Sequence, residues 1–334
     1  MKYIIKLFTI VFIAIVVVIP AQAALKKTGQ AGFKFLQVDM SARSAGMGSA
    51  FTMMGNDANS MLHNPSGIAY FESDYDVYFT NTTWIADISY IGGGVLVNFG
   101  DIGAFGLNFV TADYGEIIGT RISSSDAGFE EIGDIGGDVS AYMVGLVYAK
   151  QISAKFAMGG QIKYAVQDLA SSQLVVDGPM EENHVSGIAY EFGTTFYPGL
   201  VESFRFGMSI KNFSEELQYE QEGFQLPLTF LIGFAVDLFD IVGDVDQEMH
   251  SLTLAMDAVH PRDYTERIHL GAEYWFMNMV ALRSGYKFNY DEEGFSAGVG
   301  AKLNVSGLNL KLDYAYTDFG IFDNVNRITV GISF

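Results

Sequence analysis

The residue types that most often carry catalysis occur in this sequence without the spacing that a metal or catalytic site needs. There is no cysteine, which excludes disulfides, thiolate catalysis and cysteine-ligated metals. The five histidines are His63, His184, His250, His260 and His269, and none has the His-Glu-x-x-His spacing of a zinc site. The sequence therefore predicts a protein that is not an enzyme and that holds no metal or cofactor.

Nine ionisable residues do follow a spacing with a physical meaning. In 307–318, apolar and polar residues alternate, so Leu310 and Leu312 fall on one face and Lys311 and Asp313 on the other. Charged residues in the middle of a polar face are typical of the wall of a water-filled or plugged barrel lumen, and they would be unfavourable in the core of a β-sandwich. The residues predicted to face the lumen are Lys163, Arg267, His269, Glu273, Arg283, Lys287, Lys302, Lys311 and Asp313.

Long β-strands would position these residues. The alternating runs reach ten residues or more, whereas strands of soluble sandwiches are typically about five or six residues long. In hydrocarbon a sheet must close, because an open edge would leave backbone groups unpaired. We predict an all-β fold, a transmembrane outer-membrane β-barrel of about 14 antiparallel strands. The predicted strands are 74–83, 87–99, 102–114, 138–151, 154–168, 184–198, 202–213, 228–239, 249–259, 265–276, 279–290, 293–304, 307–318 and 325–334.

The predicted connections alternate in length. Long connections at 115–137, 169–183 and 214–227 lie on the side opposite the short ones, although 240–248 is long for a turn and 260–263 is short for a loop. Barrels of this kind have short periplasmic turns and longer outer loops. Acidic residues gather in 113–138, where the solubility of an outer loop is the favoured interpretation. Binding to basic patches on a partner, or to lipopolysaccharide phosphate through divalent cations, is the alternative.

The N-terminal part of the sequence differs from the rest. Residues 1–23 have a charged start, an apolar core and an Ala-Gln-Ala end, which predicts a cleavable signal peptide, with a retained membrane anchor as the alternative. Residues 24–72 are rich in small residues, which permit tight packing against other backbone. We predict that they form a hatch, or plug, inside a barrel of residues 73–334, the alternative being a separate periplasmic arm. Asn56 or Asp57 is expected to cap a short helix there.

The C-terminal segment alternates strictly and ends in an aromatic residue. This is the usual appearance of the final strand of outer-membrane barrels, the segment that their assembly machinery reads. The residues that form this predicted assembly signal are Ile328, Val330, Ile332 and Phe334.

The net charge limits the partners. The chain carries 19 Lys and Arg against 39 Asp and Glu, a formal charge of −20. Nucleic acid is not expected as a partner, because phosphate binding needs a basic stripe. Lipid of the bacterial outer membrane is the predicted partner and environment.

Several motifs resemble those of the PorV/PorQ family of outer-membrane proteins. They are 35–38, 41–48, 57–60, 64–67, 84–90, 271–275, 282–286, 294–298 and 313–316. The family is related to the FadL-like fatty-acid channels, which share a barrel of about fourteen strands with an N-terminal hatch. Their hatch carries an Asn-Pro-Ala motif, whereas here the third position is Ser66. The hatch residues implied by the resemblance are Arg43, Gly46, Gly48, Asp57, Asn64, Pro65 and Gly67.

The resemblance implies a role in type IX protein secretion. Family members of the PorV kind bind exported cargo proteins, deliver them to the surface attachment complex and partner the translocon. The predicted partners are therefore secretion-system components or secreted cargo. The alternative is a FadL-like outer-membrane channel for hydrophobic small molecules, which would copurify with lipid or fatty acid.

Overall fold

The computed structural model describes residues 29–173, 175–176, 178–243 and 245–334. The predicted signal peptide, residues 1–23, lies outside the described residues. Among the described residues, no helix has the length and apolar character needed to cross a membrane.

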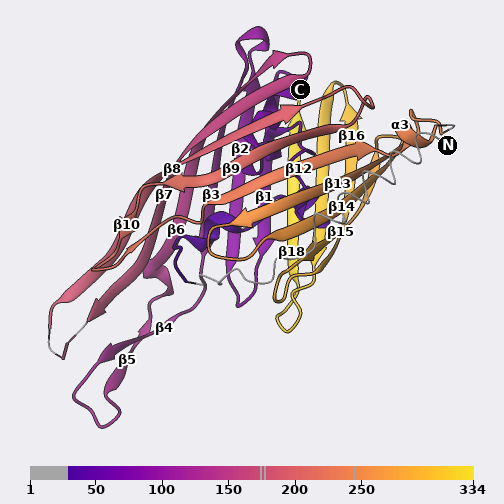
Figure 1. Cartoon of the computed structure of the whole chain (residues 1–334). Coiled ribbons are helices and arrows are strands. Elements are labelled where there is room, and N and C mark those ends of the chain that lie inside the picture. Colours follow the sequence, from indigo (N-terminus) through magenta and orange to yellow (C-terminus); the bar gives the residue numbers. More distant parts are fainter. Residues whose placement is uncertain (1–28, 174, 177, 244) are drawn as a thin grey trace.

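Fourteen strands form a closed antiparallel barrel (Figure 1), which confirms the predicted fold class. The first and last strands close it, pairing from Asp76↔Ser333 to Thr83↔Asn326. Closure pairs both edges of the barrel sheet, as a sheet in hydrocarbon requires. The barrel strands are β1 (Tyr75–Thr83), β2 (Ser89–Asn98), β3 (Ala104–Asp113), β6 (Val139–Ser153), β7 (Phe156–Gln173), β8 (Met180–Phe196), β9 (Arg205–Ser214), β12 (Thr229–Asp237), β13 (His250–Pro261), β14 (Arg267–Phe276), β15 (Val280–Phe288), β16 (Phe295–Val305), β17 (Leu308–Thr317) and β18 (Val325–Ser333).

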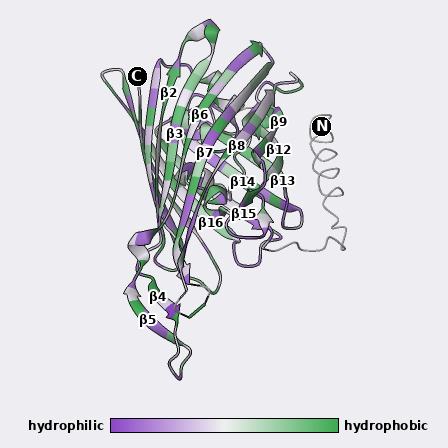
Figure 2. Ribbon diagram, turned by 90° about the vertical axis from the view of Figure 1, so that its left-hand side faces the viewer, coloured by the Kyte–Doolittle hydropathy of each residue, from purple (hydrophilic) through white to green (hydrophobic). Residues whose placement is uncertain are grey.

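Alternate residues of the strands face opposite sides of the barrel wall. In β15, Leu282 exposes 55% of its surface on the outside, while the next residue, Arg283, exposes 4% on the inside. Hydrophobic and hydrophilic bands follow one another along the strands in Figure 2. The outward row of large apolar side chains includes Phe79, Leu107, Leu146, Ile162, Leu282, Val299, Leu312 and Ile328. This exposed apolar surface is the side that lipid would cover.

The two ends of the barrel differ in their connections. The short-turn end holds the start of β1, the end of β18 and connections such as 154–155 and 306–307. The long-loop end holds the connections 114–138 and 215–228. The connection 238–249 makes the short-turn end less regular, because it includes the helix α3 (Phe239–Val242).

The longest connection contains regular structure that the sequence pattern did not predict. Residues 115–137 were expected to form a loop, whereas part of them forms a two-stranded ribbon of β4 (Ile118–Ile122) and β5 (Phe129–Asp134). The ribbon extends from the long-loop end in Figures 1 and 2. A shorter ribbon, β10 (Leu217–Gln218) with β11 (Gly223–Phe224), lies in another long connection. Both ribbons lack the long period-two run that identifies the barrel strands.

Strands β7 and β8 extend beyond their predicted ends at the long-loop side. The pairing shifts register between Asp168 and Ser171, and Ala170 has a positive φ of 62°. The Asp168 carboxylate accepts a hydrogen bond from the Ala170 N–H, which stabilises this bulge. The bulge accommodates the extra residue of β7, so the pairing with β8 continues to Gln173.

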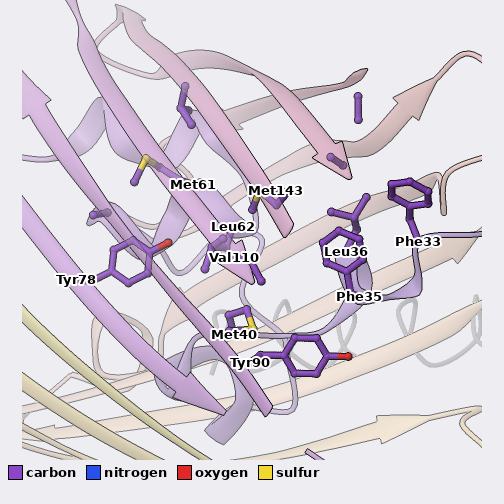
Figure 3. Packing of buried hydrophobic residues seen from close by; sticks show 14 of the residues in the cluster. Phe33, Phe35, Leu36, Met40, Met61, Leu62, Tyr78, Tyr90, Val110 and Met143 are labelled. Carbon is purple, nitrogen blue, oxygen red and sulfur yellow. The ribbon is translucent and has the colours of Figure 1, made fainter. Parts of the chain in front are cut away.

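The described N-terminal segment, residues 29–72, which we call the hatch, packs inside the ring of strands (Figure 1). Its apolar residues join the largest buried cluster, in which Met61 and Leu62 lie close to Val110 and Met143 of the wall (Figure 3). Asp57, one of the two residues expected to cap a helix, caps η2 through a capping box. The helices of the hatch are η1 (Lys34–Gln37), α2 (Ala42–Gly46), η2 (Ala58–Leu62) and η3 (Pro65–Tyr70), and short helices η4 (Gly100–Ile102) and η5 (Gly136–Asp138) lie between strands.

Candidate functional site

Glycines bring the hatch backbone against the barrel wall. A Cβ added at Gly285 of β15 would lie 2.1 Å from the backbone N of Gly48, and one at Gly271 of β14 would lie 2.5 Å from the Met47 carbonyl oxygen. Gly46 meets Gly298 of β16 in the same way, since a Cβ on Gly46 would lie 3.0 Å from the Gly298 Cα. Gly48 also has a φ of +62°, which favours glycine. The contact therefore needs glycine on both surfaces.

The Asn-Pro-Ser segment ties the hatch to the opposite wall. The Asn64 amide donates hydrogen bonds to the carbonyl oxygens of Thr52 (3.0 Å) and Thr194 of β8 (3.2 Å). Its oxygen accepts a bond from the Ser66 backbone N–H (3.1 Å), and so Asn64 caps η3. The Ser66 hydroxyl adds a bond to the Thr195 hydroxyl (2.8 Å), a contact that alanine at this position would lack.

Close approach explains the other two residues of this motif. A Cβ on Gly159 of β7 would lie 2.7 Å from the Pro65 carbonyl carbon, so Pro65 sits directly against the wall. A Cβ on Gly67 would lie 2.8 Å from the Gly55 carbonyl oxygen, within the hatch itself. Pro65 therefore packs against the wall, whereas Gly67 packs within the hatch.

A buried charge network links the hatch to three strands of the wall. Arg43 of the hatch makes two hydrogen bonds to the Glu273 carboxylate, of 2.7 and 2.8 Å. Arg283 bonds to the same carboxylate through Nε (2.7 Å) and to Asp313 through Nη1 (2.7 Å). Beside it, Lys311 pairs with Asp76 of β1 at 3.2 Å. Two guanidinium groups thus share the one carboxylate of Glu273, which lies at the centre of the network.

Asp257 is a wall residue that the sequence analysis missed. Its Oδ2 accepts hydrogen bonds from the backbone N–H groups of Phe51 (2.9 Å) and Thr52 (2.9 Å) and from the Thr52 hydroxyl (2.7 Å). The signal was present, because Asp257 follows Ala255 on the inward face of β13. Without the position of the hatch, however, one inward aspartate cannot be told from another.

A Gly-x-Ser-x-Gly pattern, residues 294–298, also serves the hatch contact. A nucleophile elbow needs this pattern at a strand-to-helix turn, but Ser296 lies within β16 and is fully buried. The Ser296 hydroxyl accepts a hydrogen bond from the Gly48 backbone N–H (2.9 Å). Its position assigns it to holding the hatch.

The hatch separates two cavities. One, of about 360 Å³, opens at the short-turn end, and we call it the short-turn cavity. The other, of about 420 Å³, lies toward the long-loop end, and we call it the long-loop cavity. The chain has two tryptophans, of which Trp275 lines the short-turn cavity and Trp84 lines the long-loop cavity.

The long-loop cavity concentrates positive charge in an acidic protein. Only Asp39 and Glu293 contribute carboxylates to its lining. Three of the cations have a carboxylate partner, because Lys34 pairs with Asp263, Lys163 with Glu191 and Lys287 with Glu293. The cations that line the cavity are Lys34, Lys163, Lys211, Arg267, Lys287 and Arg327.

The remaining three cations have weaker partners within the described residues. Lys211 donates a hydrogen bond to the Leu62 carbonyl oxygen (2.7 Å). Arg327 donates to the Asp39 carbonyl oxygen (2.6 Å) and to the Thr317 hydroxyl (2.9 Å). Arg267 stacks on the ring of Tyr290, 3.9 Å from its centroid, and its Nε has no hydrogen-bond partner among the described residues. These groups retain capacity for an anion.

The rest of the cavity lining is apolar or neutral. Leu36 and Met40 of the hatch and Val110 and Met143 of the wall are each at most 7% exposed and form one side. His63, in the hatch, lies 3.5 Å from an Asp39 oxygen. The site therefore combines apolar surface with the cations.

The structure places the nine residues predicted to face the lumen on the inner face of the barrel, in three groups. Lys163, Arg267, His269 and Lys287 line the long-loop cavity. Lys302 and Lys311 line the short-turn cavity. Glu273, Arg283 and Asp313 form the buried network between them. Sequence reasoning missed Arg327 and Lys211, although Arg327 alternates with the apolar row of β18.

The four residues of the predicted assembly signal lie along the outer row of β18 and at the chain end. Ile328 and Val330 are 50% and 44% exposed, and Phe334 stacks on Tyr75 with ring centroids 5.2 Å apart. Ile332 continues the same row. Their role in assembly stays a prediction.

Solved structures show the same architecture. The protein is similar to a Pseudomonas aeruginosa FadL homologue, with a TM-score of 0.55 and 10% identity over 88% of this chain and 98% of that one. It is similar to the Pseudomonas putida toluene transporter TodX (TM-score 0.54, 10% identity, 87% and 96% covered). A third is the CymD monoaromatic hydrocarbon channel (TM-score 0.53, 11% identity, 89% and 98% covered). The chain has the fold of the FadL-type channels.

No family model and no curated protein matches the sequence. At these identities the likeness to FadL-type channels shows the fold alone. The resemblance to the PorV/PorQ family therefore stays a prediction, as does the part in secretion that it implies.

Proposed function

We propose that this protein is a channel of the bacterial outer membrane that takes up a small apolar molecule with an acidic head group. The observation that carries the proposal is the long-loop cavity. Six cations, three of them without a carboxylate partner among the described residues, lie there beside an apolar wall in a chain of net charge −20. The apolar wall favours a hydrocarbon portion, and the cations favour an anionic group in a partly desolvated site. The FadL-type fold supports this choice, because the solved relatives named above include a toluene transporter and a monoaromatic hydrocarbon channel.

The first test is binding of two ligands that differ only in the head group. Laurate and dodecanol share a twelve-carbon chain, and Trp84 reports on the cavity in a Trp275→Phe background. The purified protein in a nonionic detergent is expected to bind laurate more tightly than dodecanol. Equal affinity for laurate and dodecanol would show that the cations do not contribute to binding. The absence of a saturable signal with either ligand would contradict the proposal.

Replacement of Lys211 by methionine is expected to weaken laurate binding by roughly 10-fold or more, because a charge-assisted hydrogen bond contributes about 1.5–3 kcal/mol. Dodecanol affinity is expected to stay within about 2-fold, since methionine keeps the length and apolar stem of the side chain. The Lys155→Met variant is the matched control, because Lys155 is exposed at the short-turn end, outside both cavities. An equal loss for both ligands would indicate a structural defect in place of a charge effect.

A second candidate is the role in type IX secretion that the family resemblance implies. The β4–β5 ribbon favours it, because Ile122 and Phe129 pair across the ribbon and are 40% and 50% exposed at the long-loop end. Crosslinking in intact cells, followed by identification of the partner, is the test. We expect a secreted protein or a secretion component at the ribbon. If deletion of the gene left every surface-delivered protein in place, this candidate would be rejected.

A further inference from the structure

The short-turn cavity contains charged groups that neither the hatch contact nor the proposed uptake site uses. The hatch forms one side of it, and the inner faces of β14 to β18 form the other. Arg43, Asp57 and Asp313 of its lining are already occupied by the charge network and the helix cap described above. Lys311 is paired with Asp76. Two cationic groups of the lining remain without a direct partner among the described residues, the Lys302 ammonium and one nitrogen of Arg283.

Lys302 lies directly opposite another cation. In the pairing of β16 with β17, its register partner is Lys311. Like charges directly opposite one another across strands destabilise a sheet unless something offsets them. Lys311 has Asp76 at 3.2 Å and Asp57 at 3.8 Å, whereas Lys302 forms no ion pair among the described residues. The described residues of the inner wall therefore supply no direct ion-pair partner for Lys302.

Arg283 supplies a second unsatisfied group in the same cavity. Its side chain is fully buried, and its Nη2 has no hydrogen-bond partner among the described residues. A buried guanidinium nitrogen without an acceptor is costly. The group lies over the β16 backbone, since a Cβ on Gly300 would be 2.8 Å from Nη2. Gly300 precedes Lys302 by two residues on the same face of β16, and both Arg283 and Lys302 line the cavity.

We infer that the short-turn cavity is a binding site for a small oxyanion, a carboxylate or a phosphate group, held by Lys302 and by Nη2 of Arg283. An oxyanion accepts both kinds of hydrogen bond and neutralises the charge of Lys302. The cavity, of about 360 Å³, has room for the anion and a small organic substituent. This site goes beyond the proposed uptake site and lies on the other side of the hatch.

One carboxylate at the rim competes for the same lysine. Glu72 lines the cavity and is exposed. Its removal gives a variant that should bind the anion more tightly. Glu72→Gln is expected to raise the affinity for an added anion, because Lys302 then loses the attraction of this exposed carboxylate.

Trp275 allows the site to be measured separately from the long-loop cavity. It lines the short-turn cavity, and its ring lies 5.5 Å from the Arg283 guanidinium carbon. In a Trp84→Phe background, sodium phosphate and sodium acetate are titrated into the detergent-solubilised full chain at constant ionic strength. We expect a saturable change in Trp275 emission with at least one of the two anions and none with sodium chloride. Comparison of the phosphate and acetate titrations shows which of the two groups the site prefers.

Variants at Lys302 test the assignment. Lys302→Gln is expected to weaken anion binding by at least roughly 10-fold, whereas Lys302→Arg is expected to retain it. The control is Lys155→Gln, which removes an exposed charge at the same end of the barrel and is expected to leave anion binding unchanged. A response to phosphate and acetate that survives Lys302→Gln would overturn the site. A response seen only by Trp84, in the Trp275→Phe background, would also overturn it by placing the anion in the long-loop cavity. A failure of laurate to change Trp84 emission would contradict the uptake proposal and would not bear on the oxyanion site.

Discussion

The Gly285→Ala variant is expected to displace the hatch from the barrel wall while the barrel remains folded. The added Cβ would lie 2.1 Å from both the Gly48 nitrogen and the Met47 carbonyl carbon. These neighbours are backbone atoms, so no side chain can rotate away. Overpacking of a tight contact typically costs about 1–3 kcal/mol, and a backbone clash belongs at the upper end of that range. The pairing of β14, β15 and β16 does not involve the Cβ and should persist.

Conductance in planar bilayers measures this displacement. The unaltered protein is expected to be nearly closed, and Gly285→Ala to show frequent or persistent openings. Gly331→Ala is the matched control, because Gly331 belongs to β18 and the nearest atom to its added Cβ is 3.4 Å away. Openings of equal size and frequency in both variants would mean that the glycine contact does not hold the hatch.

Replacement of Glu273 by glutamine is expected to cause the largest loss of stability of any single charge change in the barrel. Glu273 is 1% exposed and is the shared partner of Arg43 and Arg283. Glutamine has nearly the same shape, but Arg43 and Arg283 lose the carboxylate that they share and keep only Asp57, at 3.6 Å from Arg43, and Asp313, at 2.7 Å from Arg283. Removing one partner of a buried ion pair typically costs about 3–5 kcal/mol.

Thermal unfolding in detergent, followed by the loss of β-sheet signal, measures this loss. The Glu266→Gln variant is the control, since the Glu266 side chain is 65% exposed and its ion-pair partner among the described residues is the exposed His260. We expect no measurable change there, because exposed ion pairs contribute little. An unfolding temperature for Glu273→Gln equal to that of the control would show that the network does not stabilise the fold.

The sequence pattern predicts the barrel well because one physical constraint acts on each strand. Lipid on one side and the lumen on the other force period-two alternation, and this is why alternation alone assigns Leu282 and Arg283 to opposite faces of the wall. The β4–β5 ribbon is a separate sheet outside the barrel wall, so its residues are free of that constraint and give no comparable signal.

The candidate site is less predictable for a different reason. Alternation can assign Asp257, Lys211 and Arg327 to the inner face of the barrel wall. Which hatch residues each of them contacts depends on the position of the hatch and on the register around the barrel. Both are set by contacts between distant residues, such as Arg327 with the Asp39 carbonyl group. The contacts of Asn64 are unpredictable for a similar reason. Its side chain donates hydrogen bonds to the backbone carbonyl oxygens of Thr52 and Thr194, and every residue type carries such an oxygen, so the sequence does not identify these partners.

The most direct test of the uptake proposal is a structure of the protein with laurate bound. The proposal predicts the carboxylate within hydrogen-bond distance of Lys211 or Arg267 in the long-loop cavity, with the hydrocarbon chain against Leu36 and Val110. Laurate found only on the outer apolar surface of the barrel, with the cavity free of it, would contradict the proposal.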